Sequence, residues 1–358
     1  MSNKPSTDAS GGETNVSTTT QRCGGHITLL FTVEKANPLM RNQGSRGAGF
    51  SIHHGVEATG SLRLRAGGPK AWMSGITPDK PVDKKAHDPP KVSVVNMRGE
   101  HVENTDMYLD FIQACYDATL LRESESLEVN INLQCPTSQG FGMSSAGLIA
   151  LGRLVHKLTG RGTGGQYLKI AHRIERTHGS GLGDVLGASV GGVELRLEPG
   201  APGWPGRAVS FAVDVPVLLA WDPLEERHTA TYIDDPAWQS SITKAGAACV
   251  EELAKAPWVP GQWGALLSQS RTFADRSGML EEKQRARIFS SVRKEVLLGG
   301  WQGEMAVRLC MLGSSVAVLP RELNQQHDAE ALKALAERLE QQGVRCMLTT
   351  IAPLSPLD

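Results

Sequence analysis

Hydrophobic and polar residues alternate strictly along the segment LEVNINL at 127–133. Leu127, Val129, Ile131 and Leu133 are each separated by one acidic or amide residue. Successive side chains of a strand point to opposite faces of a sheet, so this period of two is typical of a half-buried strand. The segment therefore predicts a strand with one face in the core.

Other apolar runs favour strands without so strict a period. These segments are 25–33, 47–65 (as one or two strands), 193–197, 209–220 and 344–351. We therefore expect several strands, spread over both halves of the chain.

Helical spacing of apolar residues appears between these runs. After a Gly/Ser segment, Leu148, Leu151, Val155 and Leu158 fall on one helical face, which predicts a helix. Similar spacing predicts helices at about 105–121, 165–177, 237–256, 262–275, 281–297, 301–312 and 328–342. A short helix is also expected after Gly183.

The order of these elements predicts an α+β fold of two domains that meet near 205–210. We assign a disordered Ser/Thr-rich tail to 1–21, an N-terminal domain to 22–208 and a C-terminal α+β domain to 209–358. Segment 66–91 is rich in proline and lacks an apolar period, so it is expected to be an exposed insertion.

Charge and cysteine content narrow the function classes. The 358 residues carry a formal net charge of −1, which gives no electrostatic attraction to nucleic acid or an anionic membrane. No apolar run reaches the length of a membrane span. The six cysteines form no C-x-x-C pair, which argues against a zinc knuckle or disulfide framework and favours a cytoplasmic protein.

The segment CPTSQGFGMSSAG lies between the predicted strand 127–133 and a helix. Gly140 and Gly142 carry no Cβ, so their backbone N–H groups can approach a phosphate at the helix start. Met143 follows, and Ser144 and Ser145 supply hydroxyls, one of which could bind Mg²⁺. An ordinary N-cap serine after a tight turn is the equally weighted alternative. No Walker A lysine motif is present.

Two carboxylates lie near a second glycine-rich turn, GSGLGDV at 179–185. Asp184 on this turn could orient or deprotonate an acceptor hydroxyl, or simply cap the following helix. Glu175, nine residues upstream, could share a Mg²⁺ ion with a serine, because this ion takes few protein ligands. A solvated helix face is the alternative for Glu175.

A third motif, GSRGAG at 44–49, places Arg46 among glycines. Its guanidinium could bind a carboxylate or phosphate in a bidentate manner, although an exposed arginine in a hairpin would give the same pattern. A fourth segment, 303–318, reads as a helix, a Gly/Ser turn and a strand. It is expected to be core, or to line the far side of the cleft.

The order of these motifs resembles the GHMP small-molecule kinases. GGHIT at 24–28, the Gly/Ser loop and GSGLGDV follow one another as in that family, and MLGSSVAV at 311–318 matches its C-terminal motif. Within the family, GSRGAG together with SQGFGMS and GLGDV is similar to archaeal pantoate kinases. The resemblance runs from about 23 to 319 and implies a two-domain kinase that phosphorylates pantoate with ATP and Mg²⁺ in coenzyme A biosynthesis. It also implies an active site in the cleft between the domains, with ATP, Mg²⁺ and substrate bound by the N-terminal domain 22–208.

The resemblance also implies roles for single residues. It puts Gly140, Gly142, Met143, Ser144 and Ser145 on the phosphate loop, with Ser144 as a Mg²⁺ ligand. Glu175 becomes the second metal candidate, and Asp184 stands where many members place a catalytic aspartate. Arg46, Ser45 and His26 are candidates for substrate contacts, with Arg46 assigned to the pantoate carboxylate from its charge alone.

Two departures and several alternatives accompany this reading. Gly24–Gly25 replaces the usual Pro-Gly, and His26 replaces the lysine or arginine of many relatives. Another kinase of this type, acting on homoserine or mevalonate, is the closest alternative. A serine hydrolase with Ser144 on a nucleophile elbow, and a non-catalytic sensor, are more distant ones. A small-molecule substrate and a possible homodimer complete the expectations.

Overall fold

The computed structural model describes residues 18–64, 89–224, 236–324 and 329–354. A first sheet has the strand order β3-β4-β2-β5-β6, and β1 pairs with β2 outside this path. Its strands are β1 (Thr19–Phe31), β2 (Gly47–Leu64), β3 (Lys91–Val95), β4 (Glu125–Leu133), β5 (Val193–Glu198) and β6 (Arg207–Phe211). The pairs are antiparallel except β3–β4, which is parallel.

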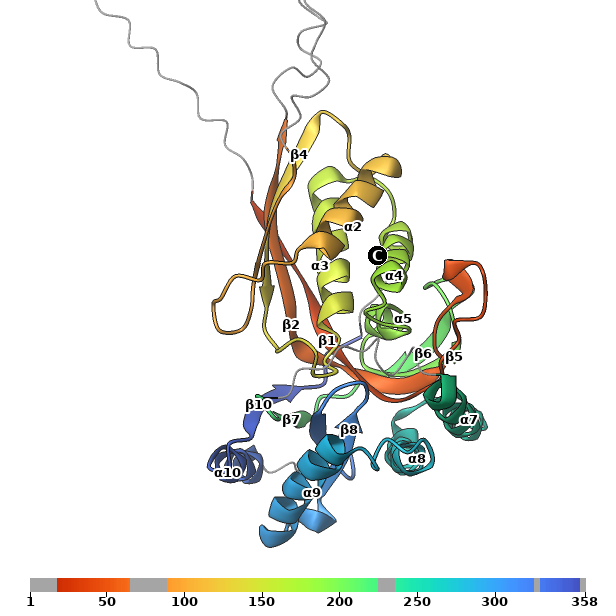
Figure 1. The fold of residues 1–358 in the computed structure, drawn as a ribbon, viewed down its shortest axis with the longest axis vertical. Helices are drawn as coiled ribbons and strands as arrows, with labels where there is room; N and C mark the ends of the chain where they lie inside the picture. The colour runs from red at the N-terminus through yellow and green to blue at the C-terminus, as the bar shows by residue number, and fades with distance from the viewer. Residues whose placement is uncertain (1–17, 65–88, 225–235, 325–328, 355–358) are drawn as a thin grey trace, which may run out of the picture.

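Four helices lie together on one face of this sheet (Figure 1). They are α2 (Asp106–Asp117), α3 (Met143–Thr159), α4 (Gly164–His178) and α5 (Asp184–Val190), and η1 (Met40–Asn42) is a short 3₁₀ turn. A capping box between Thr163 and Gln166 fixes the start of α4. α3 is buried along most of its length, which places its N-terminus deep in the molecule.

A second sheet with the order β10-β7-β9-β8 occupies the other end of the molecule (Figure 1). Its strands are β7 (Pro216–Trp221), β8 (Met305–Cys310), β9 (Ser315–Pro320) and β10 (Arg345–Thr350). The helices of this half are α7 (Pro236–Leu253), α8 (Trp263–Arg276), α9 (Lys283–Leu298) and α10 (Ala329–Glu340), with 3₁₀ turns η2 (Pro260–Gln262) and η3 (Trp301–Gly303). Helices and mixed sheets together confirm the predicted α+β class.

The predicted strand at 209–220 is wrong as a single element. The run divides into β6 and β7, which belong to different sheets. The break falls at 212–215, and Pro216 starts β7, where its missing N–H leaves no ladder bond unmade. The expected domain boundary at 208 therefore falls inside β6, and the crossing between the sheets lies a few residues later.

The predicted helix at 301–312 is also wrong. η3 is followed by β8, which forms an antiparallel hairpin with β9. The residues of β8 are almost all buried, as are those of β9. A short apolar run that is buried on both faces shows no period of two, so its spacing does not distinguish a strand from a buried helix.

The remaining expected elements form close to their predicted positions. Strand 127–133 is β4, with Leu127 and Ile131 fully buried, and 47–65 forms the single long strand β2. β1 begins at Thr19, inside the expected tail 1–21, whose first 17 residues lie outside the described part of the chain. The expected insertion at 66–91 also lies there, apart from its last three residues.

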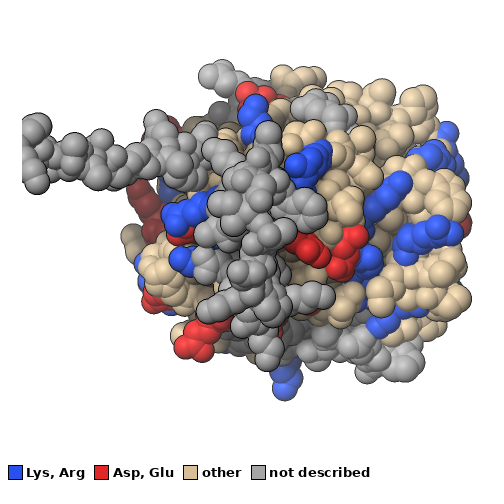
Figure 2. Space-filling model, turned by 90° about the horizontal axis from the view of Figure 1, so that it is seen from above, with Lys and Arg blue, Asp and Glu red and all other residues tan. Residues whose placement is uncertain are grey.

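Membrane-spanning helices and the distribution of surface charge can both be checked in the structure. In the described part of the chain, no helix has the length and apolar character needed to cross a membrane. Basic and acidic side chains both appear on the face seen from above (Figure 2), as the net charge of −1 would suggest.

Candidate active site

A narrow cleft brings three separate segments of the chain together. Its walls are the loop before α3, the turn before α5 and the turn between β8 and β9, and Thr28 of β1 and Arg196 of β5 also line it. Met311 and Leu312 come from the β8–β9 turn, so the fourth motif lines the far side of the cleft. Among the residues that line it are Ser45, Gly140, Gly142, Met143, Ser144, Ser145, Glu175 and Asp184.

The loop before α3 needs its glycines for two reasons. Gly140 and Gly142 have φ angles of +76° and +66°, in the left-handed region that favours glycine. A Cβ on Gly140 would lie 2.7 Å from the carbonyl oxygen of Met311, and one on Gly142 2.8 Å from the backbone N of His26. The loop is therefore packed tightly, and it leads directly into the N-terminus of α3, which favours an anion.

The two serines of this loop have different surroundings. The Ser145 hydroxyl is fully buried and donates to the carbonyl oxygen of Gly142 at 2.8 Å. Ser144 is only half-buried and lines the cleft. Ser144 is therefore the better placed hydroxyl for a ligand, and Ser145 serves the first turn of the helix.

Asp184 is held by partners from a distant strand. Its Oδ1 accepts hydrogen bonds from His26 Nδ1 at 2.9 Å and from Thr28 Oγ1 at 3.1 Å. Gly183 holds the N-cap position of α5, and Asp184 is the first helical residue. The simple capping role considered for Asp184 therefore does not match its contacts. Its side chain remains 20% exposed, enough to meet a ligand in the cleft.

His26 is a buried cation between two carboxylates. Its Nδ1 faces Asp184, and its Nε2 lies 3.1 Å from Glu194 Oε1. Burial alone would lower the pKa of His26, but the charges and hydrogen bonds of Glu194 and Asp184 raise it to about 9. The imidazole ring of His26 therefore carries a positive charge at neutral pH. His26 is not among the residues that line the cleft, and both its ring nitrogens face carboxylates, so its contacts are with Asp184 and Glu194.

The same imidazolium affects the pKa of its partner. Burial would raise the pKa of Asp184, but the hydrogen bond and charge of His26, with Arg196 and Thr28, hold it below its ordinary value. Asp184 is therefore an ionised hydrogen-bond acceptor at neutral pH.

The pKa of His26 gives a prediction for folding. A raised folded-state pKa stabilises the protein fully below about 6.5, and this contribution is lost as pH rises through about 9. The loss is on the order of 3 kcal/mol. An NMR titration should show an imidazole near pKa 9 that is missing in His26→Gln, while the exposed His53→Gln retains it. A His26 pKa at or below 6.5 would contradict the ion-pair assignment.

Glu175 is the least satisfied charged group in the cleft. It is 1% exposed, and both carboxylate oxygens are buried without a hydrogen-bond partner in the described part of the chain. Burial and the nearby charge of Asp184 raise the pKa of Glu175 to about 8. Such a carboxylate favours a cation as its partner, so the solvated-face alternative for Glu175 does not match the structure.

Glycines of the second motif make room for these side chains. A Cβ on Gly181 would collide with the Glu175 carboxylate, and one on Gly183 with the Arg196 guanidinium. A Cβ on Gly187 would collide with the His26 ring. The spacing of glycines in this segment therefore reflects the packing of buried charges.

The guanidinium that lines the cleft belongs to Arg196, whereas Arg46 points elsewhere. Arg46 Nε pairs with Glu34 at 3.3 Å on a partly exposed surface. Arg196 is 1% exposed, lies 3.5 Å from Glu194, and donates from Nη2 to Thr28 Oγ1 at 3.3 Å. Ser45 lines the cleft but donates its hydroxyl to the Arg46 carbonyl.

The chain is similar in sequence to a known family of kinases. Residues 110–192 match the GHMP kinases N terminal domain. The chain is 30% identical over 275 residues to pantoate kinase of Thermococcus kodakarensis, which covers 75% of this chain and 80% of that protein. The chain belongs to the pantoate kinase family.

Two further similarities concern the sequence and the fold. Pantoate kinase of Methanocaldococcus jannaschii is 24% identical over 259 residues, covering 72% of this chain and 80% of its own length. A solved structure described as a phosphotransferase related to the CoA biosynthesis pathway covers 94% of this chain and 97% of its own, with a TM-score of 0.68 at 21% identity. This structural likeness shows the shared fold.

The structure brings several of the residues predicted from sequence into one cleft, namely the loop before α3, Glu175 and Asp184. The sequence reasoning did not single out Thr28 or the pair Glu194 and Arg196. A signal for the pair was present, because two charged residues at i and i+2 share one face of the otherwise apolar strand VELRL. The structure shows that this face looks toward Asp184.

Proposed function

We propose that this protein transfers the γ-phosphoryl group of ATP to the 4-hydroxyl of pantoate, giving 4-phosphopantoate for coenzyme A biosynthesis. One observation carries the proposal beyond the family. An ionised aspartate, a buried arginine and a glycine-rich loop at a helix N-terminus meet in one cleft. The arginine suits the carboxylate of a hydroxy acid, the aspartate suits its hydroxyl, and the loop suits the phosphates of a nucleoside triphosphate.

The loop before α3 is the candidate phosphate site. Its glycines bring backbone N–H groups close to a ligand, and the N-terminus of α3 adds a favourable potential for negative charge. Because phosphoryl transfer depends mainly on positioning and charge stabilisation, such a cradle contributes directly to the rate.

The acceptor is held by Arg196 and Asp184 in this account. Arg196 offers a planar fork that suits the carboxylate of pantoate, which replaces the assignment to Arg46 made from sequence. Asp184 accepts the proton of the attacking hydroxyl. The His26 imidazolium and Thr28 fix the orientation of that carboxylate, so its free oxygen can face the substrate.

Ser144 and Glu175 are the proposed Mg²⁺ ligands. The unpartnered, buried carboxylate of Glu175 fits a cation, and Mg²⁺ usually takes one or two protein ligands and completes its shell with phosphates and water. When bound, the ion would neutralise charge on the phosphate oxygens. Glu175 must be ionised to hold it.

Glu175→Gln should weaken metal-dependent activity without unfolding the protein. The Mg²⁺ concentration for half-maximal turnover should rise about tenfold, because a neutral amide binds Mg²⁺ more weakly than a carboxylate does. The thermal midpoint of the metal-free protein should change little, because glutamine keeps the size of the side chain and a Glu175 carboxyl with a pKa of about 8 is already largely neutral at pH 7. The exposed Glu103→Gln is the matched control. An unchanged Mg²⁺ titration would remove Glu175 from the metal site.

Acceptor choice tests the proposed function. ADP release should require pantoate and Mg²⁺ and should be much slower with pantothenate, mevalonate or homoserine. Both relatives named above are pantoate kinases, which favours pantoate over the mevalonate and homoserine alternatives. Faster turnover with either of those compounds would overturn the substrate assignment.

Location and assembly are secondary proposals. All six cysteines are free thiols, and a kinase that uses ATP with reduced thiols suits the cytoplasm. The expected homodimer stays a prediction, which light scattering on the purified chain would test.

A further inference from the structure

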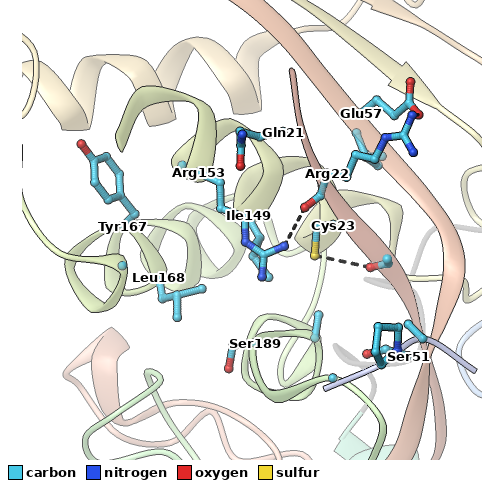
Figure 3. Close-up of a pocket in the computed structure, with 18 of the residues that line it drawn as sticks. Gln21, Arg22, Cys23, Ser51, Glu57, Ile149, Arg153, Tyr167, Leu168 and Ser189 are labelled. Atoms are coloured by element: carbon cyan, nitrogen blue, oxygen red, sulfur yellow. Dashed lines mark hydrogen bonds and ion pairs between the residues drawn. The ribbon is translucent and has the colours of Figure 1, made fainter. Parts of the chain in front are cut away.

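A second cavity lies apart from the catalytic cleft. It encloses about 970 Å³, against about 80 Å³ for the cleft. Its walls are the first residues of β1, a middle part of β2, one side of α3, the ends of α4 and α5, and the segment 352–354 (Figure 3). Its volume is within the range of ligand pockets in proteins.

This cavity contains none of the proposed catalytic groups. Asp184, Glu175 and Arg196 line the cleft and not the cavity. The two share helices but use different parts of them: α3 faces the cleft at Ser144 and the cavity at Arg153. A ligand could therefore occupy the cavity while ATP and pantoate occupy the cleft.

Basic side chains are among the residues that line the cavity. Arg22 pairs with Glu57 at 2.5 Å, so these two charges balance each other. Arg153 and Lys157 come from successive turns of α3, and the Arg153 Nη1 donates to the Arg22 carbonyl oxygen at 2.6 Å (Figure 3). Beyond the Arg22–Glu57 pair, the charged groups that line the cavity are positive, which favours an anion.

The interior of the cavity is mixed. Ile149 and Leu168 form an apolar wall (Figure 3), together with Ala188 and Pro353. The Ser51 hydroxyl lines the same space, is buried, and has no hydrogen-bond partner in the described part of the chain. A buried polar atom of this kind costs free energy unless a ligand or water satisfies it.

We infer that this cavity is a second ligand site, which binds an organic anion with an apolar body and a phosphate or carboxylate group. Arg153 and Lys157 would meet the anionic group at the rim. The body would lie against Ile149 and Leu168, and Ser51 would donate or accept a hydrogen bond at the base. Phosphate and carboxylate share this recognition chemistry, so the test separates them.

The probes are 1-naphthyl phosphate, 1-naphthoate and the neutral 1-naphthol, titrated calorimetrically into the full chain. A non-hydrolysable ATP analogue with Mg²⁺ and pantoate is kept saturating to occupy the cleft. We expect one of the anions to bind at least tenfold more tightly than 1-naphthol. The tighter anion identifies the phosphate or carboxylate class, and either result supports the site. Equal binding of all three would overturn it.

Charge reversal at the rim locates the binding. Lys157→Glu combined with His53→Glu changes two exposed positions of the cavity and should weaken the anion at least tenfold. Arg293→Glu combined with Lys294→Gln makes the same net charge change on the exposed face of α9 and should leave binding unchanged. Equal effects in the two variants would overturn the site.

Hydrogen exchange gives a readout that needs no variant. The tighter anion should slow exchange at 149–157 and 188–191 in the wild-type chain. Protection confined to 136–145 would place the anion on the phosphate loop and contradict the inference. Kinase activity with pantoate is measured separately, so failure here would leave the proposed function intact.

Discussion

Asp184→Asn is expected to lower kcat with pantoate by at least about 100-fold while ATP and pantoate still bind. A base that accepts the proton of an attacking group typically contributes about 10²–10⁴-fold, and 100-fold corresponds to about 2.7 kcal/mol of barrier. The asparagine keeps an oxygen that can accept from His26 and Thr28. It cannot take up a proton at neutral pH, so the loss reports on that step.

A positional control separates catalysis from helix stability. Asp106 is the first residue of α2, as Asp184 is of α5, and it is exposed. Asp106→Asn should leave kcat unchanged, and any small loss of stability that it shows measures the effect of a charge at a helix start. Near wild-type kcat in Asp184→Asn would show that the enzyme works by positioning alone.

Arg196→Lys is expected to raise the KM for pantoate by about 10- to 100-fold, with the KM for ATP changed less than about threefold. Lysine keeps the charge but loses the planar fork that binds a carboxylate through two parallel hydrogen bonds. Steady-state kinetics with each substrate varied in turn measures both values. Circular dichroism verifies folding, because Arg196 also pairs with the buried Glu194.

Arg46→Lys is the matched control for this substitution. Arg46 pairs with Glu34 at the partly exposed surface, so its replacement should change neither KM. A raised KM for ATP in Arg196→Lys would place the guanidinium in the phosphate site. A raised KM for pantoate in Arg46→Lys alone would restore the assignment made from sequence.

The fold was predictable wherever one face of an element meets solvent. β4 was identified because its buried and exposed residues alternate. The helices α4 and α10 were identified because their apolar residues recur every three or four positions on one face. β8 was predicted as a helix because both its faces are buried, which removes the polar positions that mark a period. The division of 209–220 between two sheets depends on tertiary pairing, which local spacing does not contain.

The cleft residues that could be singled out from sequence are those that lie together in short motifs. Gly140, Gly142 and Asp184 lie in motifs that are recognisable on their own. Thr28 and Arg196 are 168 positions apart, and only the pairing of β2 with both β1 and β5 brings them near Asp184. Arg46 was chosen because it was the arginine inside a glycine-rich motif, and the structure instead puts the buried guanidinium on β5.

Phosphorus-31 NMR tests most directly whether the enzyme phosphorylates the 4-hydroxyl of pantoate. The reaction contains ATP, Mg²⁺ and pantoate, and carbon-13 coupling locates the phosphate ester. The account predicts one phosphomonoester on C4 for each ADP formed, and almost none with Asp184→Asn. ADP without a pantoate phosphomonoester, or a phosphate elsewhere on the molecule, would contradict it.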